Sequence, residues 1–302
     1  MKKNFIRKGG GVLNNYLIMT DSSADIPQDF LDRYHPAIIP MVFEVGNEEC
    51  RHQDPDGWDS KTFFDKLRNG ATGRTSQIVP GVYVEEFSKV LDRGLDILYI
   101  SLSSGLTSTL DSANLAANMV RATYPERKVY CVDSRCATGG QGMLVMYALQ
   151  NQEKGMFLEE NAAWVENNRL KICHWFTVDD LDFLKRGGRI SPATAWIGGK
   201  LQIKPVLRIV EDGTLEITGK VRGSKIARQT IVGKFKESIF NPDFPYVYLC
   251  HGDAEPEANM MRDEILAAQP GAVVIVRPMS PIISIHTGPG VQSVIYYGSN
   301  RK

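Results

Sequence analysis

The chain has 302 residues, with 35 Lys and Arg side chains balanced by 35 Asp and Glu side chains, so its formal net charge is zero. A neutral chain lacks the strong basic excess of general nucleic-acid-binding proteins and gains little attraction to anionic membranes. With 43% hydrophobic and 23% charged residues, the composition is typical of a folded protein and not of a disordered one. The length suits two domains of about 150 residues each.

The sequence predicts neither a membrane-spanning segment nor a signal peptide. No apolar run approaches the roughly 20 residues that a spanning helix needs. The basic start, followed by three glycines, has no apolar core, and we expect residues 1–15 to be a flexible leader. The five cysteines are odd in number and include no C-x-x-C pair, which favours free thiols in a reducing compartment. We therefore expect a cytoplasmic protein without stable membrane insertion.

In the first half of the chain, apolar strand-like runs alternate with helical patterns, as is typical of an α/β fold. The expected strands are residues 16–20, 35–45, 96–102 and 128–132. Helices are expected after Pro27, from Ser60 to Asn69-Gly70, from Pro80 to about residue 93, after Gly105 to about Tyr124, and after Ser134 through Leu149. Hydroxyl-rich loops separate several of these strands from the helices that follow them.

The second half continues the alternation and adds a hairpin. The expected strands are 171–178, 246–251 and 272–278, and the expected helices are 158–168, 179–185, 224–239 and 257–268. Residues 207–221 predict a hairpin, because Asp212-Gly213 lies between two alternating runs and favours a type I′ turn. The fold class is thus α/β with two α/β domains, which we expect to cover residues 16–160 and 161–302.

Four hydroxyl-rich loops follow predicted strands. They are Asp21-Ser22-Ser23, Thr75-Ser76, Ser103-Ser104 and Asp133-Ser134. Ligands bind at the carboxyl edge of open α/β sheets, where hydroxyls and helix amides can hold an anion. Each loop could instead serve only to cap its own helix. Their recurrence on one expected edge favours a binding site.

Two further segments carry groups suited to an anion. His286, followed by Thr287-Gly288-Pro289-Gly290, could donate a hydrogen bond or act as a general base, or it could be a structural histidine. Gly187-Gly188-Arg189 could place a guanidinium beside a carboxylate or phosphate, or it could simply end a helix with an exposed arginine.

Several classes of site find no support in the sequence. There is no Walker loop, no G-x-S-x-G elbow, no H-E-x-x-H, and no clean G-x-G-x-x-G after the first strand. Cys131 and Cys136 fit no standard metal spacing. His251-Gly252-Asp253, which ends a strand, is the best remaining candidate for a metal or acid/base group, but it is interpreted as mostly structural. These patterns give no basis for a nucleotide site, a serine hydrolase or a metal centre.

Seven short segments occur in a characteristic order between residues 16 and 298. They are Asp21-Ser22-Ser23-Ala24-Asp25, Thr75-Ser76-Gln77, Ser103-Ser104-Gly105-Leu106-Thr107-Ser108-Thr109, Val132-Asp133-Ser134, Leu184-Lys185-Arg186-Gly187-Gly188-Arg189-Ile190, Lys204-Pro205-Val206-Leu207 and His286-Thr287-Gly288-Pro289-Gly290. Individually they are weak signals, but the ordered series is specific. In this series the chain resembles the DegV family of fatty-acid-binding proteins, which includes the lipid-binding subunit of bacterial fatty acid kinase.

The resemblance implies a two-domain α/β protein that holds one long-chain fatty acid in a tunnel between its domains. It implies a carrier without a catalytic site, cofactor or metal of its own, which presents the carboxylate to a separate ATP-dependent kinase for acyl-phosphate formation. The residues implied around the carboxylate are Thr75, Ser104, His286, Arg189, Ser103, Ser76 and Thr287. Arg222 matches a basic position on the face expected to meet the kinase.

Two other hypotheses stay open at the level of sequence. One is a phosphotransferase or hydrolase that acts alone, using His286, Ser104 and Asp21. The other is a sensor or scaffold whose hydroxyl-rich loops bind a phosphate. Acyl-phosphate formed from ATP and oleate by this chain alone would favour the enzyme, and sulfate or phosphate at the loops without an apolar tunnel would favour the sensor or scaffold.

Overall fold

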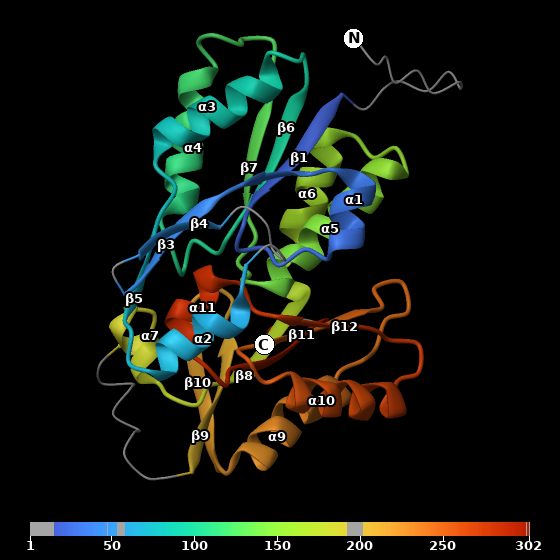
Figure 1. Cartoon of the computed structure of the whole chain (residues 1–302). Helices are drawn as coiled ribbons and strands as arrows, with labels where there is room; N and C mark the ends of the chain where they lie inside the picture. The colour runs from blue at the N-terminus through green and yellow to red at the C-terminus, as the bar shows by residue number, and fades with distance from the viewer. Residues whose placement is uncertain (1–14, 47, 53–57, 192–201, 300, 302) are drawn as a thin grey trace.

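The computed structural model describes residues 15–46, 48–52, 58–191, 202–299 and 301 (Figure 1). Apart from residue 15, the leader expected from the sequence lies outside these residues. The described residues form three sheets, and the two larger ones belong to the two halves of the chain. The α/β fold expected from the alternating pattern is confirmed.

The first half is built on a parallel sheet with the strand order β2-β1-β6-β7. Its strands are β1 (Tyr16–Asp21), β2 (Ala37–Ile39), β6 (Asp96–Ser101) and β7 (Val129–Asp133). The helices around it are α1 (Gln28–Tyr34), α3 (Pro80–Leu91), α4 (Thr109–Val120), α5 (Gly139–Glu153) and α6 (Leu158–Asn168). Figure 1 shows α3 and α4 on one side of the sheet and α5 and α6 on the other.

Successive residues of the central strand β6 point into different hydrophobic clusters. Tyr99 packs with residues of α3 and α4, whereas Leu98 and Ile100 pack with residues of α5 and α6. All three side chains are completely buried. A strand covered on both faces reads as one continuous apolar run, which is why this strand could be identified from the sequence.

A small antiparallel sheet, β4-β3-β5, lies between the two halves. Its strands are β3 (Met41–Val45), β4 (Glu48–His52) and β5 (Gly73–Ser76), and α2 (Ser60–Arg68) lies in the connection between β4 and β5. Strands β3 and β5 contact α11 (Pro281–Thr287) from the far end of the chain. The segment Thr75-Ser76 is therefore part of an edge strand, and the sequence prediction that it is a loop at the carboxyl edge of the parallel sheet is wrong.

The second half is built on a six-stranded sheet with the order β10-β9-β8-β13-β11-β12, in which only β11 and β12 are parallel neighbours. Its strands are β8 (Ile172–Thr177), β9 (Ile203–Ile209), β10 (Leu215–Arg222), β11 (Tyr246–His251), β12 (Val273–Pro278) and β13 (Gln292–Tyr297). Its helices are α7 (Asp182–Arg186), α9 (Ser224–Lys236), α10 (Glu255–Ala268) and α11. The predicted hairpin is confirmed, since β9 and β10 pair in antiparallel fashion on either side of Asp212-Gly213. Its turn is not the expected type I′, because that turn needs positive φ at both residues, and only Gly213 has it, at +84°.

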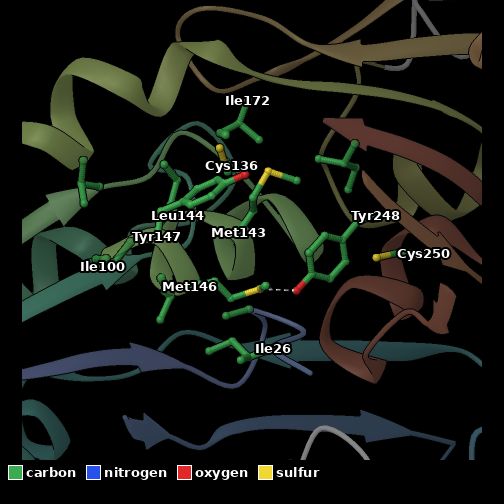
Figure 2. Close-up of a cluster of buried hydrophobic side chains, with 14 of the residues drawn as sticks. Ile26, Ile100, Cys136, Met143, Leu144, Met146, Tyr147, Ile172, Tyr248 and Cys250 are labelled. Atoms are coloured by element: carbon green, nitrogen blue, oxygen red, sulfur yellow. Dashed lines mark hydrogen bonds between the residues drawn. The ribbon is translucent and has the colours of Figure 1, made fainter. Parts of the chain in front are cut away.

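Helix α5 joins the two halves. It contacts β1 and β6 of the first sheet and also β8, β11 and β13 of the second, and residues 139–149 are all buried. Figure 2 shows Met143, Met146 and Tyr147 of α5 among side chains from both halves, with the Tyr248 hydroxyl 2.9 Å from the Met146 sulfur. A helix that is apolar on every side needs protein on every side, so α5 forms a core shared by both halves.

The expected domain boundary at residue 160 falls inside α6. This helix packs on β6 and β7 of the first sheet, and the second sheet starts only at Ile172. A boundary at the 3₁₀ turn η1 (Arg169–Lys171), directly after α6, agrees better with this packing. The division into domains stays a prediction.

Candidate functional site

A cavity of about 490 Å³ lies between the two halves. This volume is within the range of about 300–1,000 Å³ that is usual for small-molecule sites. The apolar side chains that line it come from both halves and are Met41, Leu102, Leu106, Ala137, Phe176, Leu184, Ile209, Leu215, Met279, Ile282, Ile283 and Ile295. The polar residues in the lining are Thr75, Ser76, Gln77, Thr107, Ser108, Thr138, His174, Arg189, His286, Thr287 and Ser293.

Thr75 and His286 meet at this cavity, although 211 positions separate them in the sequence. Thr75 pairs with Phe43 across β5 and β3, and α11 packs against both strands. This arrangement places the Thr75 hydroxyl 2.8 Å from Nε2 of His286. A neutral imidazole and a hydroxyl carry two polar hydrogens between them, and their mutual hydrogen bond uses one, so the pair can turn one hydrogen toward an acceptor in the cavity.

The environment of His286 keeps its imidazole neutral. Burial, and secondarily the nearby positive charge of Arg189, lowers the pKa of His286 to about 3. The other ring nitrogen, Nδ1, is buried and has no hydrogen-bond partner among the described residues. At neutral pH this side chain is therefore a neutral hydrogen-bonding group and not a cation.

The end of α7 sets the position of Arg189. The amide of Gly188 donates to the Lys185 carbonyl at 3.0 Å and the amide of Arg189 donates to the Leu184 carbonyl at 2.9 Å, which is the Schellman pattern of a helix end. Gly188 has φ of +72°, a conformation in which glycine is unstrained. The sequence left open whether this segment ends a helix or presents the arginine to a ligand, and the structure shows the helix end with Arg189 in the cavity lining.

The Arg189 guanidinium faces carbonyl groups and no carboxylate. Its Nε donates to the Leu106 carbonyl at 3.2 Å and its Nη1 donates to the Gly187 carbonyl. None of the ion pairs within the described ranges involves this side chain, and burial lowers its pKa. A partly buried cation is expensive unless an anion accompanies it. The cavity thus has a place for an anionic group.

The structure brings only some of the predicted ligands to the cavity. Thr75, Ser76, Arg189, His286 and Thr287 line it, and Ser103 and Ser104 do not. Thr287 is buried, and its hydroxyl donates to the Ile283 carbonyl at 3.3 Å, whereas Ser76 is exposed. Arg222 lies at the exposed end of β10, away from the lining.

Ser103 and Ser104 instead bind neighbouring protein groups. The hydroxyl of Ser104 donates to Asp133 at 2.5 Å, and its amide donates to the other oxygen of the same carboxylate at 3.1 Å. Ser103 donates to the carbonyl of Gly213 at 2.8 Å and so ties its loop to the β9–β10 hairpin. These contacts use both hydroxyls within the protein, and the carboxylate position predicted for them is not supported by the geometry.

Asp21 lies in a separate, internally bonded network. One of its carboxylate oxygens accepts hydrogen bonds from Tyr99 at 3.1 Å, from the Leu102 amide at 3.2 Å and from Gln141 at 3.1 Å. The other accepts from both the amide and the hydroxyl of Ser23. A buried carboxylate with this many donors holds its loop in place. His286, Ser104 and Asp21 therefore do not form one site, contrary to the hypothesis of an enzyme that acts alone.

Sequence reasoning did not single out several groups in the lining. Thr107, Ser108 and Gln77 line the cavity next to Leu106 and Ser76. All three belong to the quoted motifs, so the signal was present. Which hydroxyl of a Ser/Thr-rich turn faces the cavity depends on the turn geometry, and the residue type alone does not indicate it.

Two other groups considered at the level of sequence have structural roles. The five cysteines are free thiols, and His251 is buried with its Nδ1 accepting from the Ala254 amide at 3.3 Å. Within the described ranges, no three or more His, Cys, Asp or Glu side chains are grouped so that they could hold a metal ion. None of the helices in these ranges has both the length and the apolar character to cross a membrane.

Comparison with known proteins identifies the family. A family model described as "Uncharacterised protein, DegV family" matches residues 15–299. The chain belongs to the DegV family. A DegV domain-containing protein of Clostridium perfringens is 33% identical over 290 residues, which cover 96% of this chain and 100% of that protein.

Two solved DegV structures are similar to this chain over nearly its whole length. A DegV family protein from Thermus thermophilus, described as fatty-acid binding, has 32% identity and a TM-score of 0.81, covering 94% of this chain and 99% of that one. DegV from Bacillus subtilis, described as a fatty-acid-binding protein, has 26% identity and a TM-score of 0.81, with the same coverage. The family resemblance inferred from the ordered motifs is confirmed.

Proposed function

We propose that this chain binds one long-chain fatty acid in the cavity between its halves and presents the carboxylate to a separate ATP-dependent fatty acid kinase. The observation that carries the proposal is the half-buried Arg189 guanidinium, which has no carboxylate partner in the described residues and lies in the lining of an otherwise largely apolar cavity. A fatty acid supplies both the missing anion and an apolar tail. The solved relatives described as fatty-acid binding support the same class of ligand.

The polar and apolar parts of the cavity lining would contact different parts of the ligand. The Thr75–His286 pair would donate one hydrogen bond to the carboxylate, Thr107 would add a further hydrogen-bonding side chain, and Arg189 would balance its charge. Burying a tail of some fifteen CH₂ groups contributes roughly 12 kcal/mol before ordering and desolvation costs are subtracted. Tail burial therefore dominates affinity, and the polar groups fix which end of the molecule faces them.

Presentation to a kinase is supported by the location of the polar groups. Ser76, Gln77 and Ser108 line the cavity and are exposed, so the carboxylate would lie next to the surface and within reach of a docked partner. The sequence contains no Walker loop, which is consistent with a carrier that leaves ATP binding to the kinase. We propose that Arg222, exposed at the end of β10, contacts that kinase, and that the complex works in the cytoplasm.

Extraction of the purified protein with organic solvent, followed by mass spectrometry, tests the binding step. We expect about one long-chain fatty acid per chain. A protein that carries none, and that takes up none when incubated with oleate, would contradict the proposal.

Incubation with ATP and oleate tests the presentation step. Acyl-phosphate should form only when a fatty acid kinase subunit is added, and Arg222→Ala should lower the rate with little change in oleate affinity. Acyl-phosphate formed by this chain alone would show that it is an enzyme and would overturn the assignment as a carrier.

A further inference from the structure

Gly187 and Gly188 are adjacent glycines that meet different constraints. Gly188 has φ of +72°, and a Cβ added to it would meet nothing within 4 Å. Its backbone conformation alone explains the glycine. Gly187 has φ of −70° and ψ of −10°, an ordinary helical conformation that any L residue adopts. Something other than the backbone must explain glycine at this position.

The His286 ring fills the space where a side chain at position 187 would lie. An added Cβ would come far inside van der Waals contact with Nδ1, and it would lie 3.2 Å from Cγ and 3.3 Å from Cε1. These atoms belong to a rigid ring and not to the end of a flexible chain. The ring is also held on its other side, where Nε2 is 2.8 Å from the Thr75 hydroxyl. It cannot yield without breaking that contact.

Gly187 also contacts Arg189, the charged residue of the site. Its carbonyl accepts a hydrogen bond from Nη1 of Arg189, while its amide donates to the Phe183 carbonyl at 3.0 Å and completes the end of α7. Gly187 thus lies beside the His286 imidazole and binds the Arg189 guanidinium through its carbonyl group.

We infer that Gly187 is a positioning residue of the anion site, and that its lack of a side chain sets the location of the His286 ring relative to Thr75 and Arg189. The inference rests on the proposed function, because its test measures oleate binding, whereas the contacts of Gly187 do not depend on which ligand binds. Gly187 touches no ligand in this account, because it acts through the ring and the guanidinium. A side chain at 187 would push the ring toward Thr75 and the cavity, where the carboxylate would bind.

The test is a comparison of Gly187→Ala with Gly94→Ala in oleate titrations of delipidated protein. Gly94 follows α3 with the same φ of +72°, a Cβ added to it would meet nothing within 4 Å, and it does not line the cavity. Loss of one well-placed hydrogen bond to a charged group corresponds to about tenfold in affinity, and we expect a loss of at least that order for Gly187→Ala. Gly94→Ala places strain in the backbone away from the His286 ring and Arg189, so it should lower the thermal stability and leave oleate affinity nearly unchanged.

A double variant separates a positioning role from a general structural one. With the ring removed by His286→Ala, adding Gly187→Ala should have almost no further effect on affinity. Equal losses in both backgrounds would contradict the inference, as would wild-type affinity in Gly187→Ala. Gly187→Ala could also fail to fold. In that case, a double variant with His286→Ala that folds would show that the clash with the His286 ring prevents folding. A double variant that also fails to fold would contradict the inference. Wild-type protein that binds no oleate would instead refute the proposed function.

Discussion

At the scale of single residues, the site combines neutral hydrogen-bonding groups with one cation. Thr75 and His286 are neutral and in mutual contact, and Arg189 carries the charge. Neutral groups can bind a carboxylate without the full desolvation penalty of a second buried charge. We interpret this combination as suited to a ligand that must be held and later handed on.

Matched hydroxyl deletions test which side chains contact the carboxylate. Thr75→Val keeps the shape and the β-branched side chain that suits strand β5, but it removes the hydroxyl next to His286. We expect about tenfold weaker oleate binding. Ser104→Ala should leave oleate affinity nearly unchanged, because the Ser104 hydroxyl donates to Asp133 outside the cavity lining. If calorimetric titrations show a larger loss of oleate affinity for Ser104→Ala than for Thr75→Val, Ser104 is a ligand and our assignment is refuted.

The low pKa of His286 predicts a pH-dependent stability. Since the folded protein holds this pKa at about 3, against an ordinary value of 6.5, the unfolded chain binds more protons between these two pH values. Stability contributed by the neutral ring is therefore lost as the pH falls below 6.5. Relative to His286→Gln, wild type should lose roughly 2 kcal/mol of unfolding free energy between pH 6.5 and pH 4.5.

Denaturant titrations of both proteins at the two pH values provide the measurement. Burial raises the pKa of Asp25 to about 6, so protonation of Asp25 increases the stability of the folded protein as the pH falls. Because wild type and His286→Gln both contain Asp25, this contribution cancels in the comparison. Parallel pH profiles for wild type and His286→Gln would show that the ring is not held neutral by the fold.

At the scale of elements, the tip of the β9–β10 hairpin packs closely on the loop after β6. A Cβ added to Gly105 would lie 2.5 Å from the Gly213 carbonyl carbon and 2.7 Å from its oxygen, and the Ser103 hydroxyl donates to the same carbonyl. Residues on both sides of this contact line the cavity, Leu106 from the loop and Leu215 from the hairpin. The hairpin therefore closes one wall of the site against the first half.

Gly105→Ala should force these two backbone segments apart. Overpacking of this kind costs about 1–3 kcal/mol, and we expect the unfolding free energy to fall by that amount, together with weaker oleate binding. Gly219→Ala in β10 is the matched control, since a Cβ there meets nothing within 4 Å. Urea denaturation that cannot distinguish the two variants would show that the contact is loose in solution.

The sequence predicts some of these elements much better than others, for physical reasons. Strand β6 and the hairpin were identifiable because burial on both faces and an Asp-Gly turn leave strong patterns. Strand β5 has four residues, which are exposed or half-buried, and it has no apolar alternation by which a strand could be recognised. Its pairing with β3 depends on long-range packing with α11, and local sequence does not encode that packing.

At the scale of the whole molecule, the site exists only because the two halves come together. Thr75 and Thr107 belong to the first half, and Arg189 and His286 to the second. Between the halves, α5 forms a shared core, and Arg68 of α2 makes an ion pair with Asp253. The ordered motifs indicated the family, and five of the residues that they implied line the cavity: Thr75, Ser76, Arg189, His286 and Thr287. Ser103 and Ser104 lie outside this lining, because adjacent hydroxyls on a turn differ in direction and not in chemistry.

The central claim is that the cavity recognises a fatty acid by both its tail and its carboxylate. Calorimetric titration of the delipidated full-length protein with oleate, and separately with its methyl ester, tests this claim most directly. The ester keeps the tail but removes the negative charge that Arg189 would balance. We predict one oleate bound per chain and at least about tenfold weaker binding of the ester. Equal affinity for the two ligands, or no binding of oleate, would contradict the account.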